Sequence, residues 1–383
     1  MVIIDAREWQ NQFDLETGAR TEKTHGLAPM VKKILADHPY PGDTDPLANT
    51  WVTQTAMDLI QNYDPSLVCL SYVQQFFTIR HLDLSFQNIH DLLSAAMDEA
   101  LSFIKDSGYT PIIVGTGPMI PLSGVMDLSG LKGLAIASKW SCRYCGIHDP
   151  GPGDLDFLKG LNGMERLVTR DQWISMFKKS QPDLDLPTDI HLMPEVLAVA
   201  KEGFAFKTMG STLRPPKYIP ANNFTIPVST PLGPVRDLRE IKPLILGQNP
   251  GSKIALILLE GLGPEFFPEN YSACCNGEGW FCNEPGDSFY LTLSTGKHQP
   301  FAYPAGYRYF NHDADQIKFP FSGYLTSVPD HTLAQNLDGR SIAVGNRSMF
   351  MHMAFGADIG VECFARNLFN QGSMAVINRS CQE

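Results

Sequence analysis

The sequence predicts an α/β protein built on a mostly parallel sheet that helices cover on both faces. Short apolar runs recur along the chain with helical segments between them. Runs such as Ile254–Leu259 show no alternation of polar and apolar residues, as strands buried on both faces require. The segment from Asp64 to Met119 reads as a strand, a helix and a second strand, which is one right-handed crossover unit.

Seven apolar runs are predicted to be strands. They are Val2–Asp5, Leu67–Tyr72, Ile112–Val114, Gly133–Ala137, Ile254–Leu259, Ser341–Val344 and Met374–Ile377. Between the second and third runs, apolar residues recur at helical spacing, and Gly108 follows as a helix stop. Because the strands are predicted to be parallel, Val114, Leu259 and Val344 should lie at one edge of the sheet, where open α/β proteins bind ligands.

Two irregular regions interrupt this pattern. The prolines from Pro215 to Pro250 are too dense for an ordinary helix or interior strand, so this segment is predicted to be an arm. The region from Tyr271 to Gly323 is rich in Gly, Pro, Asn and aromatic residues and is predicted to be a long loop region. The predicted organisation is an α/β segment at 1–207, a Pro-rich arm or connector at 208–252, and an α/β segment at 253–383 that completes the same core.

Composition favours a folded, reduced protein and leaves small or metal-bound ligands open. The chain has 383 residues, and 30 basic against 41 acidic residues give a net charge of -11. This balance gives no electrostatic basis for binding nucleic acid. The start of the chain lacks the features of an export signal, and no apolar run reaches the roughly 18 to 20 residues that span a bilayer. We therefore expect a cytoplasmic protein that binds neither nucleic acid nor membrane.

Three segments, Asp64–Met119, Leu155–Phe206 and Ile254–Gly263, resemble parts of the nucleotide pyrophosphatase/phosphodiesterase branch of the alkaline phosphatase superfamily. In that family the first segment has a metal-binding turn after its strand and ends in Asp-His-Gly-Met. The third segment resembles the family's opening strand, which carries a metal-binding Asp. The order of the segments is permuted here. The resemblance implies a hydrolase that acts on a phosphate or related ester.

This chain departs from the family at the positions that bind metal. The substituting residues are Gln74, Gln75 and Phe76 followed by Arg80 and His81, then Thr116 and Gly117 in place of Asp-His, and Glu260 in place of Asp. The alternative interpretation is therefore a non-catalytic protein that binds a small molecule or a partner, keeps the sheet and lacks the metal ligands.

Carboxylates and imidazoles in the second half of the chain offer a different metal site. The candidate ligands for Zn or Mn are Glu260, His312, Asp313, Asp330 and His331. The hydroxyl of Thr326 or Ser327 would supply the nucleophile. In the alternative interpretation, His312 and Asp313 are turn residues and Asp330 caps a helix that begins near Thr332.

A second candidate site would bind an anion. Gly345, Asn346, Arg347 and Ser348 follow a predicted strand and precede a helical pattern. Backbone amides, the positive end of the helix and two side chains would then converge on a phosphate or carboxylate group. The segment lacks the Gly-Lys-Ser/Thr of a Walker loop, and ordinary capping by Asn346 or Ser348 is the alternative.

Two further motifs are weak. Cys142-Arg143-Tyr144-Cys145 has the gap of a zinc knuckle or redox pair, but no second pair at matching spacing accompanies it, so buried or incidental thiols are the alternative. Two Gly-x-Gly-Pro turns, Gly115–Pro118 and Gly261–Pro264, each follow a predicted buried strand. The first lacks the third glycine and the acidic residue of a dinucleotide-binding fingerprint, so NAD is not expected.

Overall fold

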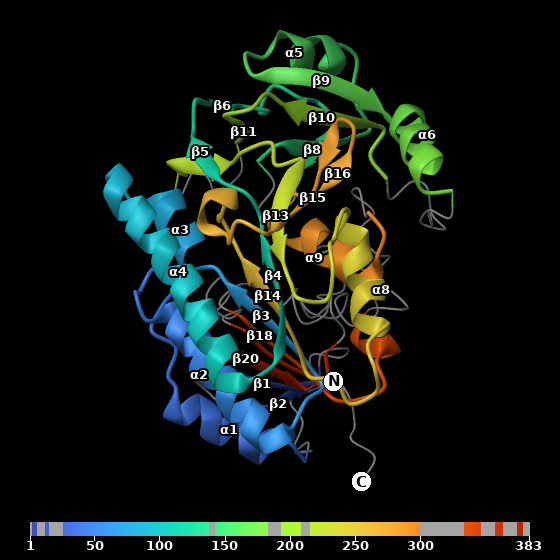
Figure 1. Ribbon diagram of the computed structural model, residues 1–383. Helices are drawn as coiled ribbons and strands as arrows, with labels where there is room; N and C mark the ends of the chain where they lie inside the picture. Colours follow the sequence, from blue (N-terminus) through green and yellow to red (C-terminus); the bar gives the residue numbers. More distant parts are fainter. Residues whose placement is uncertain are drawn as a thin grey trace.

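The computed structural model describes residues 2–5, 12–14, 26–137, 142–182, 193–207, 215–298, 333–345, 357–362 and 374–377. Within these ranges the chain forms a mixed α/β fold with one large sheet, helices on both of its faces and a smaller sheet beyond one edge (Figure 1). No helix in these ranges is long and apolar enough to cross a membrane.

The large sheet has a parallel centre with antiparallel neighbours on both sides. Its order is β15 (Ser272–Cys275), β13 (Thr225–Ser229), β4 (Thr110–Gly115), β14 (Ile254–Leu259), β3 (Leu67–Tyr72), β18 (Ser341–Gly345), β19 (Ile359–Glu362), β20 (Met374–Ile377), β1 (Val2–Asp5) and β2 (Gln12–Asp14). The strands from β4 to β19 are parallel to one another, while β13 and β20 run antiparallel to them. The predicted parallel core is confirmed, and the carboxyl ends of β4, β14, β3 and β18 meet at one edge.

Burial on both faces explains why the central runs form strands. Every residue of β3 and β14 is buried, because alternate side chains enter two separate cores. The first core contains residues of α1 (Ala28–Asp37), α2 (Ala48–Tyr63) and α4 (Phe86–Ser107). The second, on the opposite face, contains residues of α8 (Ile241–Leu246) and α9 (Asp287–Thr295).

The helix α4 forms the predicted crossover between β3 and β4. Ser85 caps its start, because the Ser85 Oγ accepts a hydrogen bond from the Asn88 backbone N at 3.2 Å. The helix ends at Gly108, whose φ of 70° lies in the left-handed region that glycine adopts without a steric penalty. A shorter helix, α3 (Gln74–His81), lies between β3 and α4 in sequence and begins directly beyond the carboxyl end of β3.

Most residues between β4 and β13 form an inserted unit, which we define as 119–220. Its antiparallel sheet has the order β7 (Leu134–Ala137), β8 (Tyr144–His148), β10 (Val196–Ala200) and β9 (Met164–Thr169), with helices α5 (Asp154–Gly160) and α6 (Arg170–Ser180). Two short pairs join β5 (Met119–Pro121) to β12 (Tyr218–Pro220) and β6 (Gly124–Met126) to β11 (Phe204–Phe206).

A hairpin of β16 (Gly277–Glu278) and β17 (Phe281–Cys282) contacts the inserted unit. The ring of Phe281 packs against the rings of Tyr144 and Phe177. The described ranges also contain the short 3-10 helices η2 (Leu238–Glu240), η3 (Pro264–Phe266) and η4 (Ala334–Asn336).

The predicted Pro-rich arm is wrong for much of its described length. Pro227 lies within β13, an interior strand that pairs with both β4 and β15. The ladder with β4 begins at Val228, so the N–H that Pro227 lacks is not needed there. Pro243 is the third residue of α8, in the first helical turn, where backbone N–H groups have no partner within the helix.

Two other predictions also need correction. The run Gly133–Ala137 forms β7 in the antiparallel sheet of the inserted unit, because four apolar residues show the same pattern in either kind of sheet. The described part of the Tyr271–Gly323 region contains β15, β16, β17 and α9 in place of a continuous loop. Residues 299–323 of that region lie outside the described ranges.

Candidate functional site

The carboxyl edge between β3 and β14 has the topology of a ligand site. These strands are adjacent and parallel, with Leu259 opposite Tyr72 at their carboxyl ends. The helix α4, which follows β3, packs on one face of the sheet, whereas α9, which follows β14, packs on the other. A crevice forms in open α/β sheets where crossovers from adjacent strands leave on opposite faces. We therefore centre the candidate site, called the edge site below, on this point.

Glu260 is the acidic side chain of the edge site. Its side chain is fully buried directly after β14, and its Oε1 accepts a hydrogen bond from the Tyr290 hydroxyl of α9. The Ser71 Oγ lies 3.0 Å from the same hydroxyl. Since the single Tyr290 proton is directed to the carboxylate, Ser71 donates to the Tyr290 oxygen. A chain of hydrogen bonds therefore runs from Ser71 through Tyr290 to Glu260.

Side-chain amides fix the backbone around Glu260. The Gln75 Nε2 donates to the backbone oxygens of Glu260 at 2.8 Å and of Tyr72 at 2.7 Å. The Gln75 Oε1 accepts from the Asn49 Nδ2 at 2.9 Å, and the Asn49 Oδ1 accepts from the Gln74 backbone N at 3.3 Å. Asn49, Gln74 and Gln75 are all buried. These neutral groups tie the ends of β3 and β14 to α2.

The two Gly-x-Gly turns pack against each other. The Gly117 backbone N donates to the Leu262 backbone oxygen at 2.9 Å, and the Gly261 backbone N donates to the Thr116 Oγ1 at 2.9 Å. Gly117 has a φ of 85°, and a Cβ there would lie 2.2 Å from the Cγ of Asn223. The turns therefore hold the ends of β4 and β14 together, and the Glu260 side chain lies on the α9 face beside them.

Two of the residues predicted for the metal and anion sites are described. Glu260 directly follows β14, and Gly345 is the last residue of β18, with β3 between these strands. The other predicted site residues lie outside the described ranges. They are His312, Asp313, Asp330 and His331 as metal ligands, Thr326 and Ser327 as nucleophiles, and Asn346, Arg347 and Ser348 as anion-binding residues. Within the described part of the chain, no group of three or more His, Cys, Asp or Glu residues could hold a metal ion.

Sequence reasoning did not select Ser71, Asn49 or Tyr290. Ser71 and Tyr290 are separated by 219 positions, and Asn49 and Gln75 by 26. One signal was present, because Ser71 is a polar residue inside an otherwise apolar run that is buried on both faces. A buried hydroxyl of this kind requires a partner, but the sequence does not say which residue provides it.

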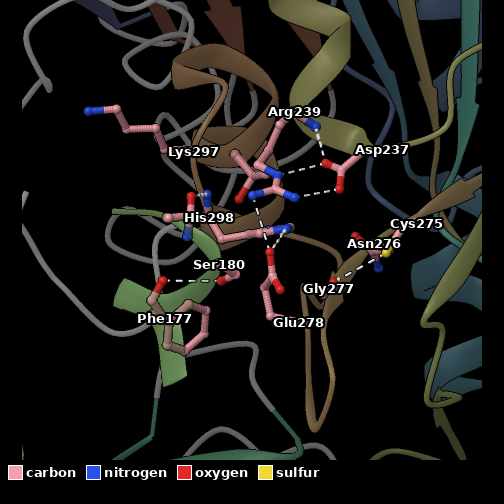
Figure 2. Close-up of polar contacts among 12 residues, drawn as sticks. Phe177, Ser180, Asp237, Arg239, Cys275, Asn276, Gly277, Glu278, Lys297 and His298 are labelled. Carbon is pink, nitrogen blue, oxygen red and sulfur yellow. Dashed lines mark hydrogen bonds and ion pairs between the residues drawn. The ribbon is translucent and has the colours of Figure 1, made fainter. Parts of the chain in front are cut away.

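A second polar cluster joins the inserted unit to the large sheet. Figure 2 shows Arg239 between two carboxylates. Arg239 binds Asp237 through its Nε at 2.8 Å and its Nη2 at 2.7 Å, and its Nη1 lies 3.1 Å from the Glu278 Oε1. Burial raises the pKa of Asp237, but the hydrogen bonds and charge of Arg239 outweigh burial and hold this pKa below its usual value.

The fully buried His298 completes this cluster. Its Nδ1 lies 3.0 Å from the Asn283 Nδ2, which also donates to the Asn276 backbone oxygen at 3.0 Å. The Asn276 oxygen can only accept, so the Asn283 nitrogen is the donor to Nδ1 and the neutral ring carries its hydrogen on Nε2. This Nε2 lies 3.8 Å from the Glu278 Oε1 and has no hydrogen-bond partner among the described residues. The His298 backbone N donates to the Gln181 Oε1 of the inserted unit at 2.9 Å.

Burial controls the charge of His298. It lowers the pKa of His298 to about 4, with a further contribution from the positive charge of Arg239 and an opposing one from Asp237. The ring is therefore neutral near pH 7. Groups with perturbed pKa values occur at functional sites, but structural ion-pair networks perturb them too. The contacts of His298 with the inserted unit favour a structural role here.

The cysteine pair is buried. The Cys142 Sγ accepts a hydrogen bond from the Arg80 Nη2 at 3.3 Å, and burial raises the pKa of Cys145 to about 12. Burial also raises the pKa of Cys142, and Arg80 partly opposes this effect. Thiols of this kind are protonated near pH 7 and react slowly, which favours the interpretation of Cys142 and Cys145 as structural residues.

No family model matches the chain. No curated protein and no solved structure matches it either. The resemblance to the nucleotide pyrophosphatase/phosphodiesterase branch stays a prediction from the sequence.

Proposed function

We propose that this chain is a non-catalytic protein that binds a small polar molecule at the edge site. The observation that carries the proposal is the hydrogen bonding of Glu260. Its buried carboxylate accepts a hydrogen bond from the Tyr290 hydroxyl. The neighbouring positions, where the resemblance calls for carboxylates and imidazoles, hold Gln74, Gln75 and Thr116, which bond to other parts of the protein. Neutral amides and hydroxyls recognise hydrogen-bonding ligands but are poor ligands for Zn or Mn.

A second candidate is a metal-dependent phosphoric ester hydrolase. It is favoured by the position of Glu260, since a carboxylate at the end of a buried parallel strand stands where the resemblance places a metal-binding Asp. In that case Glu260, His312, Asp313, Asp330 and His331 would hold Zn or Mn. Thr326 or Ser327 would attack the ester, and Gly345 to Ser348 would bind its anionic group. Glu260 could keep its bond with Tyr290 in that case, because the other oxygen of the same carboxylate would serve as the metal ligand.

Metal analysis and ligand screening on the same purified protein separate the two candidates. We expect no bound Zn or Mn, no turnover of bis-p-nitrophenyl phosphate with either metal, and a saturable rise of the melting temperature with one member of a panel of nucleotides and sugar phosphates. Glu260→Gln should weaken that binding, whereas Glu265→Gln, at an exposed position five residues later, should not. Metal-dependent turnover that Glu260→Gln abolishes would establish the hydrolase instead.

A further inference from the structure

The guanidinium of Arg80 is buried between α3 and the inserted unit. Arg80 lies in the last turn of α3 and is 7% exposed. Its Nη2 donates to the Cys142 Sγ at 3.3 Å, and its Cζ lies 5.8 Å from the centre of the Phe76 ring. Its Nη1 is buried and has no hydrogen-bond partner among the described residues. A thiol is a weak acceptor, so this cation is poorly compensated.

Among the described residues, Arg143 of the inserted unit is an arginine of similar burial whose guanidinium has several hydrogen-bond partners. Arg143 is 6% exposed. It donates to the Glu165 Oε2 at 3.0 Å, to the Ala200 backbone oxygen at 3.2 Å and to the Asn222 Oδ1. No described carboxylate forms an ion pair with Arg80. Because an arginine stays charged at all relevant pH values, burial without an anion is costly.

Among the described residues, the acidic groups close to Arg80 in sequence or around Cys142 bind other partners. The Glu284 Oε1 accepts hydrogen bonds from the backbone N of Cys142 at 3.0 Å and of Arg143 at 3.1 Å. Asp83 is bound to the Lys217 Nζ at 3.1 Å, and its side chain is 86% exposed.

We propose that Arg80 anchors an anion site that accepts one oxyanion group, a phosphate or a carboxylate, of a small molecule. The unpartnered Nη1 presents the donor, and the ring of Phe76 and the apolar side chains around Cys142 provide a low-dielectric setting that strengthens the bond. This site lies at the opposite end of α3 from Gln74 and Gln75, so it stands independently of the edge site.

Thermal unfolding of the full chain in the presence of simple anions tests the proposal. Inorganic phosphate and acetate are titrated separately, with sodium chloride holding the ionic strength constant. The proteins are the wild type, Arg80→Met, Arg80→Lys and the control Arg166→Met. The side chain of Arg166 is 47% exposed in the wild type. We expect phosphate, acetate or both to raise the melting temperature of the wild type and of Arg166→Met by a few degrees in a saturable way. The more effective anion identifies the group that the site prefers.

Arg80→Met should show no such rise, and without added anion it should be at least as stable as the wild type, because it removes an uncompensated buried charge. Arg80→Lys should respond at higher anion concentration, since an ammonium lacks the planar fork of a guanidinium. A wild type without a saturable response overturns the proposal. An Arg80→Met protein that responds to anion like the wild type also overturns it. The same holds if Arg80→Met is less stable than the wild type both with and without anion. If Arg80→Met does not fold, an Arg80→Lys response equal to that of the wild type overturns it.

Discussion

Replacing His298 with asparagine should flatten the dependence of stability on pH between about pH 6.5 and pH 4. Burial, together with the charge of Arg239, lowers the pKa of His298 from its ordinary 6.5 to about 4 in the folded protein. Across this window the unfolded chain binds a proton at this residue and the folded protein does not. The contribution of His298 to the unfolding free energy is therefore fully present above pH 6.5 and is lost as the pH falls toward 4.

The pKa difference sets the size of the effect. The pKa of His298 falls by about 2.5, from 6.5 in the unfolded chain to about 4 in the folded protein. This difference corresponds to roughly 3 kcal/mol of unfolding free energy. Asparagine is a matched replacement because it does not titrate and its Oδ1 can accept the bond that Nδ1 accepts from Asn283. Its smaller side chain should lower stability at pH 7 by roughly 1–3 kcal/mol. The informative quantity is therefore the change between pH 7 and pH 4.

Urea unfolding followed by tryptophan fluorescence between pH 7 and pH 4 measures this change. His90→Asn is the control, because the side chain of His90 is 54% exposed. The wild type and His90→Asn should each lose roughly 3 kcal/mol more than His298→Asn across the range. Equal losses in all three proteins would refute the argument that burial keeps His298 neutral.

Three further predictions follow from single contacts. Gly117→Ala should lower the unfolding free energy by roughly 2–4 kcal/mol in urea unfolding, because φ is 85° and the new Cβ would meet Asn223; Gly160→Ala, with no atom within 4 Å of the new Cβ, should leave it nearly unchanged. Tyr290→Phe should lower the unfolding free energy by roughly 1–3 kcal/mol, because it removes a hydrogen-bond donor from the buried Glu260. The double variant Tyr290→Phe/Glu260→Gln should recover part of that loss. A Tyr290→Phe protein as stable as the wild type would contradict the hydrogen-bond chain. Of the six cysteines in the described ranges, Cys275 alone is exposed, so Cys275→Ser should remove the fast-reacting thiol that these six contribute in a DTNB assay, whereas Cys274→Ser should not.

The central strands could be predicted to the residue because their environment is uniform. Leu67–Tyr72 and Ile254–Leu259 are apolar throughout except at Ser71, and the structure buries both runs completely. Their neighbours were harder. The strand β13 contains Pro227, and whether a proline fits depends on which of its two ladders needs the N–H. Which strands pair with β13, and in which register, cannot be read from the local sequence around Pro227.

The edge site was predictable in place but not in composition. Two glycine turns after buried strands indicated the edge of the sheet where the candidate site is centred, and Glu260 was selected from its position at the end of a buried strand. The residues that determine its chemistry, Asn49, Gln75 and Tyr290, come from three different helices. Each is an ordinary residue in its own helix, and only the parallel arrangement of β3 and β14 brings the three together.

The composition of this edge bears on how the fold tolerates polar groups in its core. A pair of divalent ions would demand several carboxylates, whose mutual repulsion the metal charge would offset. With one carboxylate in the described cluster, neutral donors are sufficient, and Tyr290 and Gln75 provide them to the side chain and backbone of Glu260. The geometry of such a network depends on every partner being present, because a buried amide or phenol left unpaired is costly. The amide nitrogen of Gln75 donates only to main-chain oxygens, those of Tyr72 and Glu260, among its described partners. Substitution of Gln75 should therefore weaken the proposed ligand binding at the edge site indirectly, by shifting the backbone of Glu260.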